Sequence, residues 1–389
     1  MFLEMVKKRN PELIDYSVFL HQNGSILPDT YVLDLDRIKE NASKLTSKAD
    51  EMGIELFFML KQIGRNPLVA KELIKSGMKS PVVVDYKEAK VMMDNNIPLG
   101  NVGHLVQIPD HFLKKVMSYG ATYITVYSIE KLRKINEVAL DLGIKQNILL
   151  RVIGKEDAIY PGQYGGFLIE ELNDYIDEFK KLSGCNLIGV TSFPCILYDK
   201  EKKDFELTPN ASTLNKAKEL LEKNGLSILE LNVPSANTVR TLPLIKEIGG
   251  TQGEPGHALT GTSPMHAEFE LEEKPAYVYV SEVSHNGPDS AFIYGGGYYP
   301  RGHLENVLID TGDSIMESKV KDFPSDNIDY HLEIENKQVV GATAIMAFRT
   351  QVFVTRSHVA VVEGLSKGEP KLLGVYDSQG NKVEGMTYG

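Results

Sequence analysis

The chain has 389 residues, of which 42% are hydrophobic and 24% charged, a composition typical of a globular protein with room for two domains. Its formal net charge of −11 argues against a general nucleic-acid-binding surface, which normally carries a basic stripe. The longest uncharged apolar run, residues 338–348, is too short to span a membrane, and charges and Pro11 interrupt the N-terminal segment, so it does not resemble a signal peptide. We therefore expect a cytoplasmic protein that binds neither nucleic acid nor membranes.

The cysteines and histidines give no metal or disulfide pattern. Cys185 and Cys195 lack CxxC spacing, and two thiols in a chain of this size fit a reducing compartment. The nine histidines include no HExxH motif. The sequence therefore predicts no metal site.

Strand-like and helix-like segments alternate from about residue 30 to residue 262. The helix after Asn66 has that residue as N-cap and Pro67 at its first position, and Ser128 caps a helix that ends at Gly143. The apolar segments that we predict to be strands are TYVLDL, LFFML, PVVVD, VGHLVQI, TYITVYS, NILLRVI, LIGVTSF and SILELNV, with one more implied near TQGEPGHALTG. Apolar strands separated by amphipathic helices indicate a parallel sheet that is covered on its faces.

After an opening strand at Tyr31, eight strand–helix units predict an α/β fold of the (β/α)8 TIM-barrel type. The alternative, a doubly wound sheet, is disfavoured because the GxGxxG and GxxxxGK[ST] motifs are missing. Beyond about Met265, short strands joined by Gly, Asp and Asn turns predict a β-rich domain. We expect an N-terminal extension (residues 1–28) that packs with the C-terminal domain, a barrel (29–265) and a C-terminal β domain (266–389).

Lys61 follows the first barrel strand directly, at the strand end where such barrels carry their active sites. A lysine there either extends its amine into solvent or uses that amine to form a Schiff base. The residue alone does not decide between these two roles.

The loops after strands seven and eight are candidates for phosphate binding, which recurs at these positions in barrels. The first contains PSANT, and the second is GEPGHALTG, whose glycines permit close backbone approach. Glu254 lies between these glycines. It is either a solvated loop carboxylate or, if a phosphorylated pyridine binds at the barrel mouth, the group that keeps the ring nitrogen protonated.

Six segments follow one another in the order seen in fold-type III pyridoxal-phosphate (PLP) enzymes: YVLDLDRIKENA, LKQIGRNPLVAKEL, GQYGGF, GVTSF, PSANT and EPGHALTGTSP. The later YGGGYYPRG stretch resembles the Gly-Tyr-Pro-Arg region of racemase C-terminal domains. Over residues 29–302 the chain resembles the alanine racemase-like family, and within it the YhfX-type branch. The resemblance implies a PLP-binding barrel, a C-terminal β domain and PLP as the cofactor.

By this resemblance, Lys61 matches the lysine that holds PLP as an internal aldimine. Arg65 stands where alanine racemases have a phosphate-binding tyrosine, so it is expected to pair with the phosphate as a charged substitute. Ser192 lies near a family position that contacts the pyridine ring. The remaining cofactor-binding residues implied by the phosphate loops are Ser235, Asn237, Thr238, Gly256 and His257.

The chain also departs from the racemase pattern. Alanine racemases place an arginine, in Arg-Pro-Gly, against the pyridine nitrogen, whereas Glu254 stands in Glu-Pro-Gly and resembles the fold-type III decarboxylases. A carboxylate favours a protonated pyridine, which is the stronger electron sink, and so widens the range of possible reactions. The Cys-aspartate signature of those decarboxylases is not evident, and the racemases' catalytic tyrosine motif is not cleanly present.

A racemase that uses two bases needs a proton donor opposite Lys61. The candidates, each of which has an alternative role as a packed aromatic or a surface histidine, are His285, Tyr294, Tyr298 and Tyr299. In this fold the second base usually comes from the partner subunit, which implies a homodimer with its active site at the interface. Arg301 is either a ligand for a substrate carboxylate or part of a surface turn, and Tyr164 stands where racemases carry a substrate-side arginine.

We therefore expect a PLP-dependent amino-acid racemase or epimerase in which Lys61 abstracts or returns the Cα proton. The alternative suggested by Glu254 is decarboxylation or lysis of an amino acid. A PLP-binding homeostasis protein and a barrel without cofactor are the remaining possibilities, and the second domain counts against the former.

Overall fold

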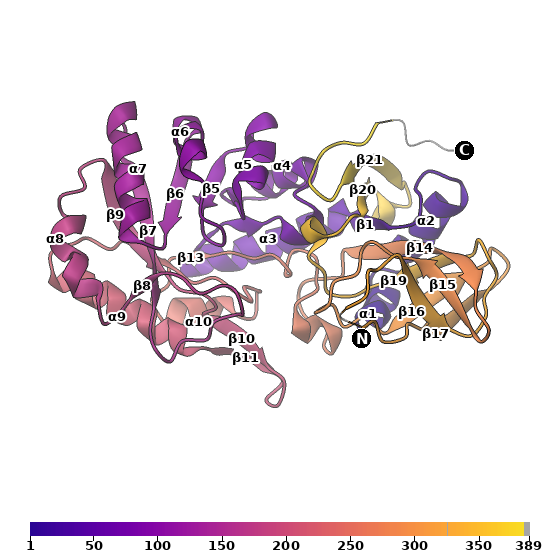
Figure 1. The fold of residues 1–389 in the computed structure, drawn as a ribbon. Coiled ribbons are helices and arrows are strands. Elements are labelled where there is room, and N and C mark those ends of the chain that lie inside the picture. The colour runs from indigo at the N-terminus through magenta and orange to yellow at the C-terminus, as the bar shows by residue number, and fades with distance from the viewer. Residues whose placement is uncertain (325, 385–389) are drawn as a thin grey trace. The chain divides into compact units, whose positions relative to one another are not determined.

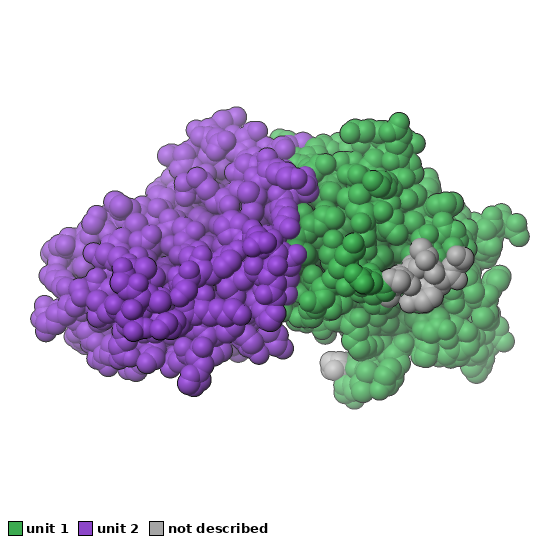
Figure 2. All heavy atoms as spheres, turned by 90° about the horizontal axis from the view of Figure 1, so that it is seen from above, with its two compact units in different colours: residues 1–41, 61–69, 257–389 green, residues 42–60, 70–256 purple. Residues whose placement is uncertain are grey.

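The computed structural model of the protein describes residues 1–324 and 326–384 (Figure 1). The chain forms two compact units, which Figure 2 shows in different colours. Unit 1 consists of residues 1–41, 61–69 and 257–389, and unit 2 of residues 42–60 and 70–256. This division differs from the three-part division expected from the sequence, whose bounds stay a prediction. Within the described part of the chain, no helix has both the length and the apolar character needed to cross a membrane.

Unit 2 contains a parallel barrel. Its paired strands, in order round the sheet, are β2 (Glu55–Leu56), β13 (Gln252–Gly253), β12 (Glu230–Asn232), β9 (Cys185–Thr191), β7 (Gln146–Ile153), β6 (Ala121–Val126) and β5 (Leu99–Val102). The sequence of pairings continues through a parallel bridge between Val83 and Val102 to β4 (Pro81–Val82), which pairs with β3 (Phe58–Met59). Only Phe57 separates β2 from β3, so these two short strands act as one, and the sheet closes into a barrel. The predicted (β/α)8 barrel is confirmed.

Helices alternate with the barrel strands, as Figure 1 shows for α5, α6 and α7 beside β5, β6 and β7. The predicted N-cap at Ser128 is confirmed, because its Oγ accepts a hydrogen bond from the Lys131 N–H, and Gly143 ends that helix at φ 64°. Asn66 caps its helix through hydrogen bonds to Oδ1 from two main-chain N–H groups. The helices of the chain are α1 (Phe2–Arg9), α2 (Pro11–Gln22), α3 (Leu35–Met52), α4 (Pro67–Lys75), α5 (Tyr86–Asp94), α6 (Asp110–Tyr119), α7 (Ile129–Leu142), α8 (Ile176–Phe179), α9 (Pro209–Lys223) and α10 (Leu242–Glu247).

The predicted strand VGHLVQI is wrong in its position, because β5 ends at Val102 and the following residues form a loop. Gly103 leaves the extended conformation at φ 84°. The side chain of Gln107 then donates hydrogen bonds to the carbonyl oxygens of Gly103 and Thr125 at 2.7 and 2.8 Å. These oxygens are therefore satisfied by a side chain, so the segment needs no neighbouring strand.

Unit 1 contains a sheet that is largely antiparallel, which confirms the β-rich C-terminal domain. Its main path is β17 (Ile315–Lys319), β16 (Asn306–Asp310), β19 (Thr343–Met346), β14 (Tyr277–Asn286), β1 (Thr30–Asp34), β20 (His358–Glu363) and β21 (Lys371–Asp377). Strand β15 (Ser290–Tyr294) joins β14 to β18 (His331–Glu335). The strand at Tyr31 thus lies between β14 and β20, not in the barrel domain to which its place in the sequence assigned it.

The N-terminal helices share the core of this sheet. Phe2 of α1 and Leu13 of α2 belong to one buried hydrophobic cluster with Val278 and Ala360 of the strands. The remaining short elements are β8 (Phe167–Leu168), the hairpin β10 (Ile196–Asp199) and β11 (Asp204–Leu207), and the 3₁₀ turns η1 (Lys61–Ile63), η2 (Leu172–Tyr175), η3 (Pro264–Ala267), η4 (Val352–Val354) and η5 (Leu365–Lys367).

Candidate functional site

Glu254 is a buried carboxylate inside the barrel of unit 2. It follows β13, the last barrel strand, and is only 5% exposed. Its Oε1 accepts hydrogen bonds from the side-chain amides of Asn101 at 2.9 Å and Asn232 at 3.0 Å, while Oε2 lies 3.5 Å from Nε2 of His104. A carboxylate that accepts N–H donors is stabilised in its ionised form. We call Asn101, His104, Asn232 and Glu254 the Glu254 cluster.

Two threonines fix the direction of these amides. The hydroxyl of Thr125 donates to Oδ1 of Asn101 at 2.7 Å, and that of Thr191 donates to Oδ1 of Asn232 at 2.7 Å. Each amide oxygen is thereby occupied, so each amide turns its N–H group toward Glu254. The two asparagines and the two threonines are fully buried, and each lies on a different barrel strand: Asn101 on β5, Thr125 on β6, Thr191 on β9 and Asn232 on β12. The barrel interior therefore holds a preformed acceptor at the carboxyl end of its strands.

The predicted phosphate loop after β12 is strained and tightly hydrogen-bonded. Ser235 and Ala236 both adopt positive φ angles, 90° and 46°, which are uncommon outside glycine and concentrate at functional sites. Asn237 donates to the carbonyl oxygens of Val233 and Ser235, and its Oδ1 accepts from the Glu254 N–H. The turn is thus connected directly to the Glu254 cluster.

Other predicted residues of unit 2 have identified partners. The N–H of Thr238 already donates to the hydroxyl of Thr241 at 2.8 Å, and Ser192 Oγ accepts from Asn210 at 3.1 Å. Gly256 is half-buried, whereas Tyr164 is 69% exposed. The roles assigned to these residues stay predictions.

Lys61 lies in unit 1, at the start of η1, and is half-buried. In the same unit, Nε of Arg349 donates to Nε2 of His257 at 3.1 Å, and Nδ1 of His257 contacts the hydroxyl of Thr262 at 3.1 Å. Burial, followed by the charges of Arg349 and Lys61, lowers the pKa of His257 well below its ordinary value. His257 is therefore neutral at physiological pH and accepts the arginine proton at Nε2.

Arg65 is buried, with an exposed fraction of 2%, at a φ of 54°. Its Nη1 donates to Oε1 of Gln379 at 2.7 Å, and its guanidinium lies 5.0 Å from the centre of the Phe353 ring. Gly64, just before it, has room for no side chain, because a Cβ there would lie 2.8 Å from Val359. A buried guanidinium beside a close-packed turn is suited to holding an anion.

The candidate second bases fall into two groups within unit 1. His285 stacks on Phe292 and packs edge-on against His331, whose ring also contacts Tyr294, so this group lies on the β14, β15 and β18 strands. The second group lies in the loop after β15. There the Tyr298 ring packs 4.7 Å from that of Phe323, and Arg301 donates to the hydroxyl of Tyr299 at 2.8 Å. The charge of Arg301 also contributes to the lowered pKa of His257.

Several residues of these clusters were not predicted from the sequence, namely Asn101, His104, Asn232, Arg349 and Gln351. Gln351 Nε2 lies 3.4 Å from His257 Nε2. Asn232 interrupts the apolar pattern of the predicted strand SILELNV, which was the available signal, whereas Asn101 directly precedes the predicted segment VGHLVQI. His104 lies inside the misplaced strand, and Arg349 directly follows the apolar run at residues 338–348.

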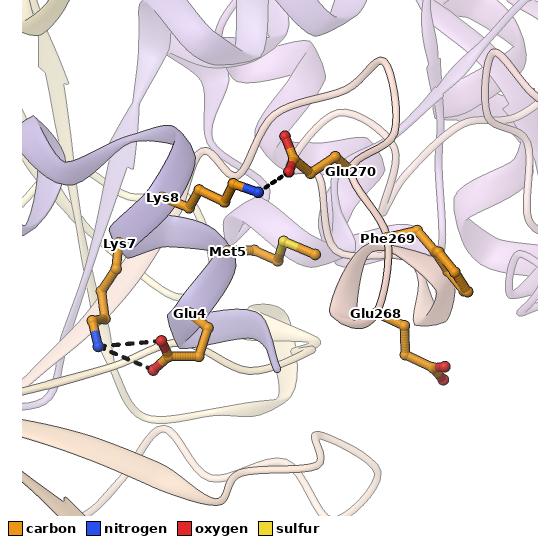
Figure 3. A pocket seen from close by; sticks show the side chains of 7 residues that line it. All are labelled: Glu4, Met5, Lys7, Lys8, Glu268, Phe269 and Glu270. Carbon is orange, nitrogen blue, oxygen red and sulfur yellow. Dashed lines mark hydrogen bonds and ion pairs between the residues drawn. The ribbon is translucent and has the colours of Figure 1, made fainter.

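A surface depression of about 570 Å³ lies elsewhere in unit 1 (Figure 3). In it Lys7 pairs with Glu4 at 3.2 Å, and Lys8 pairs with Glu270. Its lining residues are Glu4, Met5, Lys7, Lys8, Glu268, Phe269 and Glu270, none of which is a predicted site residue. Among the residues that the structure describes, no group of three or more His, Cys, Asp or Glu side chains is arranged to hold a metal ion.

Each unit carries residues of the kinds that PLP requires. Glu254 offers a buried, oriented carboxylate to a protonated ring nitrogen, which is the partner that a pyridinium requires. In unit 2 the strained turn at Ser235 offers hydrogen-bond donors, and in unit 1 the buried Arg65 offers positive charge, both of which are suited to phosphate. Lys61 offers a primary amine for the aldehyde.

Two family models match the chain. The alanine racemase N-terminal domain matches residues 33–264, and the YhfX-like C-terminal domain matches residues 278–372. The uncharacterized protein YhfX of Escherichia coli K12 is 42% identical over 385 residues, which cover 98% of this chain and 100% of that protein.

Solved structures share the fold at low sequence identity. An alanine racemase from Clostridium difficile 630, in complex with cycloserine, matches with a TM-score of 0.66 at 19% identity, over 90% of this chain and 99% of that one. D-threonine aldolase from Filomicrobium marinum matches with a TM-score of 0.66 at 14% identity, over 90% and 94%. D-threo-3-hydroxyaspartate dehydratase from Delftia sp. HT23 matches with a TM-score of 0.63 at 15% identity, over 88% and 95%.

The family-model matches and the near full-length relative agree with the barrel and the β-rich domain. The fold family includes racemases, aldolases and dehydratases. The chain belongs to the alanine racemase-like family of PLP-binding proteins, in its YhfX branch.

Proposed function

We propose that the protein is a PLP-dependent amino-acid racemase or epimerase. The observation that carries the proposal is the buried Glu254 carboxylate, held by two amide donors whose own orientation is fixed. A buried charge is unfavourable unless it is paired with a hydrogen-bond donor or an opposite charge, or serves a function. Charged groups at the carboxyl ends of barrel strands are typical of active sites. Lys61 follows the first barrel strand in the chain and supplies the amine.

Bound PLP supplies an aldehyde that condenses with amines and a ring that stabilises negative charge at the adjacent carbon. Glu254 would accept a hydrogen bond from the protonated ring nitrogen and so keep the ring electron-poor. The candidate groups for holding the phosphate would be the turn at Ser235 in unit 2 and the guanidinium of Arg65 in unit 1. Lys61 Nζ would remove the proton from one face of Cα, a step that requires its unprotonated amine, or return a proton to that same face.

We further propose that the chain acts as a homodimer, because racemisation with inversion needs a proton donor on the second face of Cα. The donor would be one of the tyrosines Tyr294, Tyr298 and Tyr299, or His285, supplied by the second copy. Arg301 would bind the substrate carboxylate, and Tyr164 would contact the substrate where racemases use an arginine.

Decarboxylation or lysis of an amino acid is the second candidate. Glu254 favours it, because a protonated ring also stabilises the negative charge left when a carboxylate or a side-chain fragment departs. The two candidates differ in their products. Racemisation changes only handedness, whereas the alternative releases CO2, a keto acid or an aldehyde.

The test is an amino-acid panel in D2O with the purified protein after addition of PLP. Proton NMR reports loss of the Cα–H signal, and chiral chromatography reports the product's handedness. We expect Cα–H exchange with inversion for at least one amino acid, none with Lys61→Ala, and unchanged rates with the exposed control Lys75→Ala. Exchange accompanied by CO2 or a carbonyl product would establish the second candidate instead. A PLP-loaded protein that exchanges no amino acid would contradict both and leave the PLP-homeostasis role.

A further inference from the structure

The loop after β5 places one imidazole ring at a fixed position inside unit 2. Gly103 turns the chain, and the Gln107 amide fastens the turn to the carbonyl oxygen of Thr125. The hydroxyl of Tyr127 donates to the carbonyl oxygen of His104. The chain at His104 is therefore held by neighbours on both sides, and its ring is only 1% exposed.

Contacts of Arg151 hold Tyr127, and so the chain at His104, in place. Nη1 of Arg151 donates to the Tyr127 hydroxyl at 2.7 Å, its guanidinium lies 4.8 Å from the Tyr127 ring centre, and Nη2 donates to the Gln163 carbonyl oxygen at 2.9 Å. The edge of the His104 ring meets Phe193 at 5.7 Å between ring centres. The ring is thus confined by packing, and its Nε2 faces Glu254 at 3.5 Å.

The two oxygens of Glu254 have different partners. Oε1 accepts from the Asn101 and Asn232 amides, whose orientation is fixed by the threonine hydroxyls of β6 and β9. Oε2 faces His104. Amide donors on one oxygen do not fix the rotation of the carboxylate plane, whereas a confined imidazole at the other oxygen does.

We propose that His104 is a positioning residue that orients Glu254 and keeps it ionised toward the ring nitrogen of PLP. This inference rests on the proposed cofactor and on the role of Glu254, and adds His104 to them. At 3.5 Å, a ring N–H at Nε2 would attract the negative charge of Glu254 electrostatically, and a protonated ring would do so more strongly. Tyr127, whose pKa burial raises, contacts the chain at His104, and Arg151 pairs with Tyr127. Neither supplies a negative charge that competes with Glu254.

The experiment compares binding of PLP with binding of an analogue in which the ring nitrogen is replaced by C–H. The ratio of the two dissociation constants measures the interaction at the nitrogen and does not depend on turnover. We compare wild type with His104→Leu, which removes the nitrogen at similar volume, and His104→Gln, which keeps an N–H donor. Exposed His111, on α6 of the same unit, provides the control His111→Leu.

We expect wild type and the His111 control to bind PLP more tightly than the analogue. We expect the ratio of the two dissociation constants to change about tenfold in His104→Leu and to stay within about threefold of wild type in His104→Gln. If His104→Leu does not fold, as judged by its thermal unfolding, His104→Gln decides alone. A Leu variant that keeps the full preference, or Leu and Gln variants that lose it equally, would show that the ring only packs.

Failure of the inference differs from failure of the proposed function. Wild type that binds PLP covalently at Lys61 but shows no preference over the analogue would overturn the inference and leave the cofactor in place. Wild type that binds neither compound would overturn both.

Discussion

Replacing Asp29 with asparagine is expected to make the stability of the protein less dependent on pH. Asp29 lies just before β1, where its carboxylate accepts a hydrogen bond from the Tyr279 hydroxyl at 2.9 Å and another from Ser357. Burial is the main cause that raises its pKa to about 6, against 3.8 for the free side chain, and the nearby charge of Asp329 adds to the rise. Hydrogen bonds from Ser357 and Tyr279 and the charge of Arg356 oppose it.

The sign follows from proton binding. With its pKa raised on folding, Asp29 binds protons more tightly in the folded state, so its contribution to stability is fully present below pH 4 and is lost as the pH rises through about 6. A shift of roughly two pKa units corresponds to at most about 3 kcal/mol. Asparagine stays neutral, accepts the same hydrogen bonds and tolerates the φ of 62° at this position.

The assay is urea unfolding followed by far-UV circular dichroism at pH 4 and pH 8. We expect Asp29→Asn to match wild type at pH 4 within error and to exceed it at pH 8 by up to about 3 kcal/mol. Histidines with lowered pKa, such as His21 and His358, destabilise both proteins equally in acid and cancel in the comparison. The exposed control Asp289→Asn is expected to show no such difference. An Asp29 variant whose advantage is the same at both pH values, or larger at pH 4, would refute the reasoning.

Three further predictions concern the contact between Arg349 and His257, the Glu254 cluster and the loop that carries His104. Arg349→Ala is expected to raise the pKa of His257 toward its ordinary value, because one of the charges that lowers it is removed, and an NMR titration that finds no rise would contradict this. Asn101→Leu leaves Glu254 with one fewer amide donor, and we expect a loss of about 1–3 kcal/mol of unfolding free energy together with weaker PLP retention. Gly103→Ala is expected to lower the unfolding free energy by about 1–3 kcal/mol, because alanine is strained at φ 84°; an unchanged urea midpoint would argue against it.

The parts of the fold that depend on nearby residues could be predicted from the sequence. The caps at Asn66 and Ser128 use hydrogen bonds within three residues, and the apolar strands of the barrel have a local signature. The sheet to which a strand belongs depends on residues far away in the chain. The strand at Tyr31 pairs with strands near Tyr279 and Val359, far along the chain, and its own residues do not encode those partners.

The candidate site divides in the same way. Lys61 and Glu254 could be chosen because a charged residue at a barrel strand end is visible in the sequence, and the family resemblance gave each a role. His104 and Arg349 could not, since their importance depends on a side chain more than 90 residues away in the chain. The segment VGHLVQI is apolar enough to predict a strand, and the positive φ of Gly103 together with the Gln107 side chain explains why it is a loop.

The measurement that tests the central claim most directly is borohydride reduction of the purified protein with PLP, followed by peptide mass mapping. The account predicts a yellow protein whose visible band disappears on reduction, with the pyridoxyl mass on the peptide that contains Lys61. A protein that stays colourless with added PLP, or that carries the mass on another lysine while Lys61 is unmodified, would contradict it.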